Sequence, residues 1–125
     1  MHRRVDDRPL IFLLEDDRAA ADALQLVLRD WGADVVHGVN VGEVLSAGGP
    51  RAHDASMIIT DFHLSDETNG VSLARELRGH APHARVLVLS GSTSGEAQRA
   101  ADDAGYAFMR KPAAPKDIIA WLEHA

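Results

Sequence analysis

Two apolar stretches of this chain end on acidic residues, at the points where buried strands would leave a protein core. Residues 57–60 are followed by Asp61, and residues 10–14 are followed by the consecutive acids 15–17. If the two stretches form neighbouring parallel strands, three or four carboxylates converge at one edge of a sheet. Carboxylates gathered in this way repel one another unless a cation joins them, and their oxygen atoms suit Mg²⁺.

A hydroxyl and an ammonium group follow two further apolar stretches. Ser90 ends the stretch that begins at residue 85, and Lys111 stands two residues after Met109. Facing the acids, such groups supply a hydrogen-bond donor and a positive charge, which fits the oxygens of a phosphoryl group on Asp61. Because aspartate is a covalent phosphoryl acceptor in other systems, the residues predict a carboxylate that accepts a phosphoryl group with the help of Mg²⁺.

Five strand-like segments alternate with five helical segments, and the reactive side chains stand at strand ends. The expected strands are residues 10–15, 34–37, 56–61, 85–90 and 106–109, and the expected helices are residues 18–31, 41–47, 70–78, 94–104 and 115–123. Alternation with nearly continuous apolar strands predicts a parallel sheet covered on both faces, which is a three-layer α/β domain. Ligands of such sheets bind beyond the carboxyl ends of the strands. Only the second strand, which ends at His37, offers little there.

Polar residues mark the expected helix starts. Asp17 can cap the first helix, and the pairs Asn40 with Glu43 and Thr93 with Glu96 have the spacing of capping boxes.

Composition restricts the classes of protein to which the chain can belong. Residues 1–9 read as a polar lead-in and residues 10–125 as one folded domain. The lack of cysteine excludes disulfide and thiolate chemistry and favours the cytoplasm. A net charge of −6 argues against direct nucleic-acid binding. The apolar run at residues 10–14 is too short to span a membrane.

The motifs at the strand ends resemble, in order and spacing, the signature of response-regulator receiver domains. They are Leu-Leu-Glu-Asp-Asp at 13–17, Ile-Thr-Asp at 59–61, Leu-Ser-Gly at 89–91 and Arg-Lys-Pro at 110–112. The resemblance implies a flavodoxin-like (βα)5 fold with strand order 2-1-3-4-5, the order of the chemotaxis member of the family. It also implies a role in bacterial two-component or phosphorelay signalling.

By this resemblance, Asp61 is the phosphoacceptor. Glu15 and Asp16 would hold Mg²⁺ together with Asp61, and the backbone carbonyl of His63 would complete the protein's share of the coordination.

The resemblance also assigns the groups that respond to phosphorylation. Lys111 would pair with the phosphoryl group, Ser90 would be the switch hydroxyl, and Phe108 matches the aromatic switch of the family. The peptide bond between Lys111 and Pro112 is often cis in these domains. The shifts of Ser90 and Phe108 would repack the face formed by the last strand and the last two helices, where a downstream protein partner binds.

The implied phosphodonor is a histidine kinase or a histidine-containing phosphotransfer protein. Slow self-dephosphorylation would follow, so the chain is expected not to be a turnover enzyme. Two alternatives stay open: a Mg²⁺-dependent phosphohydrolase with Asp61 as nucleophile, and a docking domain that is not phosphorylated. Haloacid-dehalogenase-like hydrolases usually carry a second aspartate two residues after the nucleophile, where this chain has His63.

Two features bear on context. The loop after Asp61 lacks the proline that the family commonly has near Ser65, and it is one residue longer before Gly70, as in receivers attached to hybrid sensor kinases. The start at Met1 slightly favours a stand-alone receiver over a domain cut from a larger protein. Trp121, at the edge of the last helix's apolar face, is a candidate anchor for a homodimer or another partner.

Overall fold

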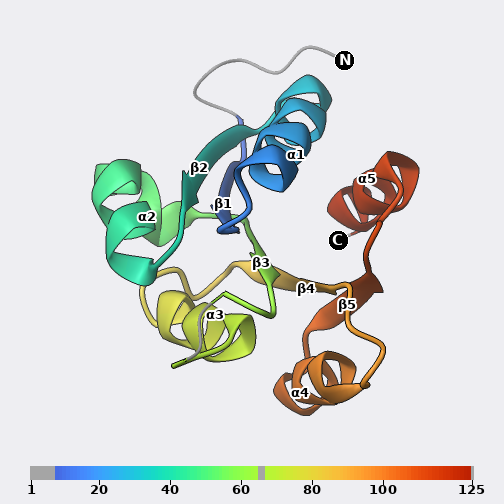
Figure 1. Ribbon diagram of the computed structural model, residues 1–125. Coiled ribbons are helices and arrows are strands. Elements are labelled where there is room, and N and C mark those ends of the chain that lie inside the picture. Colours follow the sequence, from blue (N-terminus) through green and yellow to red (C-terminus); the bar gives the residue numbers. More distant parts are fainter. Residues whose placement is uncertain (1–7, 65–66, 125) are drawn as a thin grey trace.

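Strands and helices alternate along the whole chain (Figure 1). The computed structural model describes residues 8–64 and 67–124. The strands are β1 (Leu10–Leu14), β2 (Asp34–Gly38), β3 (Met57–Asp61), β4 (Arg85–Ser90) and β5 (Ala107–Arg110). The helices are α1 (Arg18–Trp31), α2 (Val41–Gly48), α3 (Gly70–Arg78), α4 (Glu96–Ala104) and α5 (Pro115–Glu123), with a short 3-10 helix η2 (Gly49–Asp54) after α2.

The five strands form one parallel sheet in the order β2-β1-β3-β4-β5, which confirms the order implied by the resemblance. Parallel neighbours need crossover connections, and a helix supplies each of them here. The chain places β2 on one side of β1 and β3 on the other. The switch point of the sheet therefore lies between β1 and β3, where ligands of this kind of fold bind.

Apolar side chains of the strands point alternately to two cores, one on each face of the sheet. Phe12 and Ile58 belong to the core beneath α2, α3 and α4. Ile11 and Ile59 belong to the core beneath α1 and α5. Figure 1 shows these two groups of helices on opposite faces of the sheet. The three-layer prediction is therefore confirmed, and burial on both faces explains why the strands are almost continuously apolar.

The first two helices begin at the predicted caps. Asp17 Oδ1 accepts a hydrogen bond from the backbone N–H of Ala20 at 3.1 Å, and Asn40 Oδ1 accepts one from Glu43 at 2.9 Å. The reciprocal bond of the second cap differs from a standard capping box, because Glu43 Oε1 accepts from the N–H of Val39 at 2.9 Å.

The capping box predicted at Thr93 is wrong. Helix α4 begins at Glu96, and its N-cap is Gly95, with φ of 81° and no side-chain cap. The only nearby hydroxyl bond to the helix is weak, from the N–H of Glu96 to Ser94 Oγ at 3.3 Å. A capping box needs an extended N-cap residue, and the left-handed turn at Gly95 replaces it.

Smaller differences affect segment ends. The last strand is shifted by one residue relative to the prediction, so that Arg110 belongs to β5, and the first strand ends before Glu15.

Most of the predicted lead-in, residues 1–7, lies outside the described residues, as does Ser65 in the loop that suggested a hybrid-kinase lineage. Among residues 8–64 and 67–124, no helix is both long and apolar enough to cross a membrane.

Candidate functional site

The parallel sheet brings the predicted acids, hydroxyl and lysine to one edge. Asp61 ends β3, Glu15 directly follows β1, Ser90 ends β4 and Lys111 directly follows β5. Three of these polar residues are buried, with exposed fractions of 1% for Glu15, 8% for Asp61 and 0% for Ser90. Buried polar groups need partners, and the contacts among these residues supply most of them.

Lys111 lies between two of the carboxylates. Its Nζ is 3.0 Å from Glu15 Oε2 and 3.4 Å from Asp61 Oδ1. Carboxylate oxygens of Glu15, Asp16 and Asp61 all lie within 4.8 Å of one another. The donor set consists of oxygen atoms without nitrogen or sulfur, which is the set that hard cations prefer. These three acids therefore fit a divalent cation such as Mg²⁺.

The electrostatic environment opposes ionisation of Asp61 and favours the charge of Lys111. Burial, followed by the charge of Glu15, raises the pKa of Asp61, although Lys111 and the backbone N–H of His63 act in the opposite direction. For Lys111, burial alone would lower the pKa, but the hydrogen bond that Lys111 donates to Glu15 and the charges of both acids outweigh burial and raise it. Asp61 is thus a buried carboxyl group whose charged form an added cation would stabilise.

Every polar group of Glu15 is engaged. Its Oε1 accepts from the N–H of Asp17 at 3.0 Å, and its Oε2 binds Lys111. Its backbone N–H donates to the carbonyl of Gly38 at 3.3 Å, and its backbone carbonyl lies 2.6 Å from His37 Nε2. Sequence reasoning missed His37. The available signal was a polar residue at the carboxyl end of a strand that the fold places next to β1.

Gly70, the first residue of α3, packs directly against the backbone of Asp61. Its N–H donates to the carbonyl of Phe62 at 2.8 Å, and a Cβ atom at this position would lie 2.0 Å from the carbonyl oxygen of Asp61. Asn69 caps the helix by accepting from the N–H of Ser72 at 3.0 Å. Only glycine permits this approach, so Gly70 is a second site residue that the sequence did not reveal.

One side-chain bond ties the loop after Ser90 to β5, and two further bonds join Ser90 to this loop and to Lys111. Ser90 Oγ accepts from the N–H of Ser92 at 3.1 Å, and the carbonyl of Ser90 accepts from the N–H of Lys111 at 2.9 Å. Arg110 Nη1 donates to the carbonyl of Ser92 at 3.0 Å. These bonds connect Ser90 with this loop and with the end of β5. The peptide bond between Lys111 and Pro112 is cis, as the resemblance implied.

The two remaining predicted residues lie at the margin of the site. His63 is exposed, and its ring meets that of Phe62 edge to face at 4.9 Å between centroids. Phe108 is partly buried and packs against the core beneath α2, α3 and α4, whereas its neighbour Met109 packs against the core beneath α1 and α5.

The fold is that of a known family. Residues 11–123 match the response regulator receiver domain, and the chain belongs to this family. It is therefore a receiver domain of response-regulator signalling.

Individual relatives agree with this assignment. The chain is 28% identical over 121 residues to the cell cycle transcriptional regulator CtrA of Caulobacter vibrioides, a match that covers 88% of this chain and 47% of that protein. The chain thus spans about half the length of the curated relative. A receiver domain protein (CheY-like) from Methanospirillum hungatei shares the fold, with a TM-score of 0.77, 22% identity and coverage of 94% of this chain and 92% of that one.

A further solved structure is informative about chemistry. It is a response regulator from Burkholderia pseudomallei with a phosphorylated aspartic acid, a calcium ion and citrate. It is 29% identical to this chain with a TM-score of 0.77, covering 93% of this chain and 67% of that one.

Proposed function

We propose that Asp61 accepts a phosphoryl group from a phosphohistidine of a histidine kinase or histidine phosphotransfer protein. The observation that carries this proposal is the convergence of Glu15, Asp16 and Asp61 within 4.8 Å, with Lys111 bonded to two of them. The phosphorylated aspartic acid and cation of the Burkholderia relative support the same chemistry. The three acids, together with the backbone carbonyl of His63, would hold Mg²⁺, which neutralises negative charge when bound.

The transfer exchanges one bond to phosphorus for another. An oxygen of Asp61 bonds to phosphorus while the P–N bond of the donor breaks, and the imidazole leaves with the bonding electron pair. Lys111 carries three N–H donors, of which Glu15 and Asp61 engage two. The third donor is available to a phosphoryl oxygen, so Lys111 can pair with the product without leaving its present position.

Ser90 would sense the product. Its oxygen accepts from the N–H of Ser92, which leaves its own O–H as a donor for a phosphoryl oxygen. A shift of Ser90 toward that oxygen would pull on the loop that Arg110 ties to β5. Phe108 would then repack on the side of α4, which shifts the population of two arrangements of the face formed by α4, β5 and α5.

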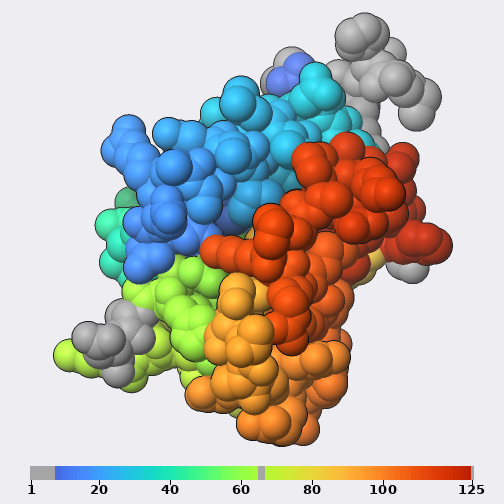
Figure 2. Space-filling model, turned by 45° about the vertical axis from the view of Figure 1, so that its right-hand side comes forward, coloured from blue at the N-terminus to red at the C-terminus, as the bar shows by residue number. Residues whose placement is uncertain are grey.

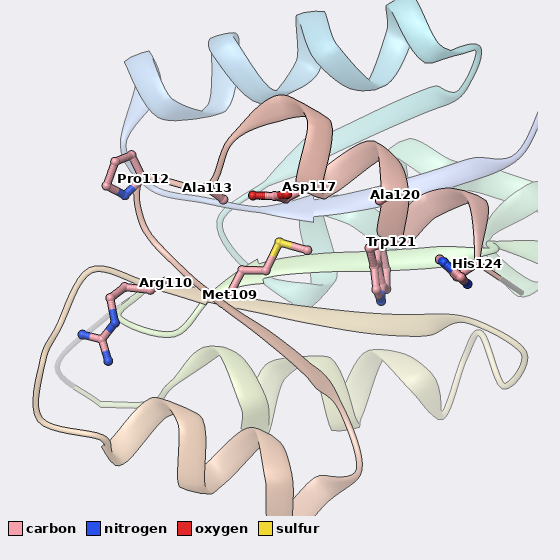
Figure 3. Close-up of a pocket in the computed structure, with 8 residues that line it drawn as sticks. All are labelled: Met109, Arg110, Pro112, Ala113, Asp117, Ala120, Trp121 and His124. Carbon is pink, nitrogen blue, oxygen red and sulfur yellow. The ribbon is translucent and has the colours of Figure 1, made fainter.

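The same face carries a hollow of about 510 Å³ between β5 and α5 (Figure 3). Its lining residues are Met109, Arg110, Pro112, Ala113, Asp117, Ala120, Trp121 and His124. Figure 2 shows the red surface of α5 and the orange surface of α4 on the same side of the molecule, so one partner could cover both elements. Trp121 is partly buried here, with the Arg85 guanidinium 4.4 Å from its ring centroid.

A downstream protein is the partner that we assign to this face, and a second copy of the chain is the alternative. The expected location is the cytoplasm, because phosphohistidine donors of this kind act there. The net charge of −6 favours protein partners over nucleic acid.

Intact mass measured after incubation with a small-molecule phosphodonor and Mg²⁺ tests the proposal. The wild-type chain should gain one phosphoryl group, and Asp61→Asn should gain none. Asp17→Asn is the matched control, because asparagine caps a helix as well as aspartate does and Asp17 lies outside the acidic cluster. Rapid consumption of the donor without an adduct would support a phosphohydrolase. An intact donor and no adduct would support a docking domain that is not phosphorylated.

A further inference from the structure

The end of β2 holds the backbone of Glu15 on both sides of its α-carbon. The N–H of Glu15 donates to the carbonyl of Gly38 at 3.3 Å, and the carbonyl of Glu15 is 2.6 Å from His37 Nε2. A carbonyl oxygen only accepts hydrogen bonds, so Nε2 of His37 must carry the proton. His37 and Gly38 are consecutive residues of β2, and His37 makes its bond through the side chain whereas Gly38 uses its backbone.

This side-chain bond replaces a bond of the sheet. The last register pair between β1 and β2 is Leu14 with Gly38, and His37 stands opposite Leu13. Glu15 lies beyond the end of β1, where the chain turns toward α1 and the regular ladder stops. Because Glu15 is only 1% exposed, its carbonyl has little access to water. The imidazole supplies the partner that neither the sheet nor the solvent provides.

The orientation of this carbonyl matters because it belongs to the peptide unit that joins Glu15 to Asp16. A peptide unit is planar, so fixing its C=O fixes the direction in which the next α-carbon leaves. Asp16 is exposed, and its side chain makes no hydrogen bond or ion pair with any group in the described part of the chain. The placement of its carboxylate near those of Glu15 and Asp61 therefore depends on the backbone that carries it.

We infer that His37 is a positioning residue of the cation site: its Nε2–H holds the peptide between Glu15 and Asp16 so that both carboxylates face Asp61. The inference rests on the proposed function, since it assigns a role toward the cation that the acids would hold. Groups that hydrogen-bond to the residues that ligate a metal commonly change the metal affinity by a factor of about 10 to 100.

Three substitutions separate the hydrogen bond from the shape of the side chain. The amide nitrogen of His37→Gln reaches about as far from the α-carbon as Nε2 does, whereas that of His37→Asn stops near the position of Nδ1. His37→Leu has no donor. Titration with MgCl₂ at one fixed pH, followed through the backbone amide signals of Glu15, Asp16 and Asp61, gives the dissociation constant directly.

We expect Mg²⁺ to bind His37→Asn and His37→Leu about tenfold more weakly than wild type, and His37→Gln to bind within about twofold of wild type. Equal binding by all four chains would overturn the inference. Equal weakening in all three variants would also overturn it, because the donor would then not be what matters. If His37→Leu fails to fold, the comparison between the glutamine and asparagine variants still decides.

Phosphorylation provides a second readout that separates this inference from the proposed function. The His37→Asn variant should need more Mg²⁺ for half-maximal phosphorylation and reach the wild-type rate at saturating Mg²⁺. If the wild-type chain gains no phosphoryl group, the proposed function fails while the Mg²⁺ titrations still test His37. If the wild type is phosphorylated and His37→Asn has an unchanged Mg²⁺ requirement, the role of His37 fails alone.

Discussion

Lys111 is bonded more closely to Glu15 than to Asp61, at 3.0 Å against 3.4 Å. Glu15 is almost fully buried, and an ionised carboxylate in such a place needs a cationic partner. Lys111 therefore maintains the charge balance of the acids in the absence of a phosphoryl group. Because it also contacts Asp61, the same ammonium stands beside the group that is proposed to react.

The first prediction concerns stability and pH. The pKa of Asp61 lies above its ordinary value of 3.8 because of burial and the charge of Glu15. The folded protein thus binds this proton more tightly than the unfolded chain, and stability falls as pH rises through the raised pKa. Asp61→Asn should therefore melt at a higher temperature than wild type at pH 7. The expected difference is about 4 °C for each kcal/mol by which the substitution raises the free energy of unfolding.

The gain in melting temperature of Asp61→Asn should shrink as pH falls. It should vanish below the ordinary pKa of 3.8, where Asp61 of the wild type is protonated in both the folded and the unfolded state. Calorimetric melting curves between about pH 3 and 8 measure it. An equal melting temperature at neutral pH would contradict the raised pKa of Asp61. Asp17→Asn, at an exposed helix cap, should show no such gain.

The second prediction concerns the contact behind the phosphoacceptor. Gly70→Ala would place a Cβ atom 2.0 Å from the carbonyl oxygen of Asp61. Because both atoms are attached directly to the backbone, neither can move away by rotation of a side chain. We expect a loss of about 3 kcal/mol in the free energy of unfolding, measured by urea denaturation, together with slower phosphorylation. Gly42→Ala is the control, because its Cβ would meet nothing nearer than 3.4 Å. It should stabilise helix α2 by about 0.5 to 1 kcal/mol.

The third prediction concerns the tie between β5 and the loop after Ser90. Arg110→Met keeps an unbranched stem of similar length up to Nε but removes the guanidinium and its bond to the carbonyl of Ser92. An exposed bond of this kind contributes about 0.5 to 1.5 kcal/mol, so amide exchange in residues 92–95 should accelerate roughly two- to twelvefold. Arg75→Met, at an exposed position on α3, should leave that exchange unchanged. Unaltered exchange in Arg110→Met would show that the tie does not hold the loop.

The fourth prediction concerns helix α4. It buries only the small side chains of Ala97 and Ala101, and it begins without a side-chain cap. Little apolar area is therefore lost to water when it opens locally. We expect its amides to exchange at least about tenfold faster than those of α3, which buries Val71 and Leu77 and has a capping asparagine. Similar exchange rates in the two helices would contradict this.

The strand ends could be predicted from the sequence because a buried strand leaves a local signal, namely an apolar run that stops at a polar residue. Asp61, Glu15 and Ser90 all follow such runs, and the fold brings them together. The distances among them depend on strand order, which came from the resemblance rather than from the residues themselves.

What sequence reasoning missed depends on contacts between distant segments. His37 acquires its role because β2 pairs with β1 and its side chain reaches past the last pair of the ladder. Gly70 is required because α3 approaches the backbone of Asp61, and a glycine at a helix start has many possible reasons. Before α4, the sequence has the spacing of a capping box, but the left-handed turn at Gly95 makes the helix begin at Glu96 instead.

The alternation of β5 has a consequence for how the domain could serve several partners. Phe108 faces the layer that contains α4, and Met109 faces the layer that contains α5 and α1. Under the proposed function, the face formed by α4, β5 and α5 changes on phosphorylation, whereas α1 lies outside that face. A protein that contacts only α1 would bind the phosphorylated and unphosphorylated chains equally well. One that also contacts α4 would distinguish between the two states.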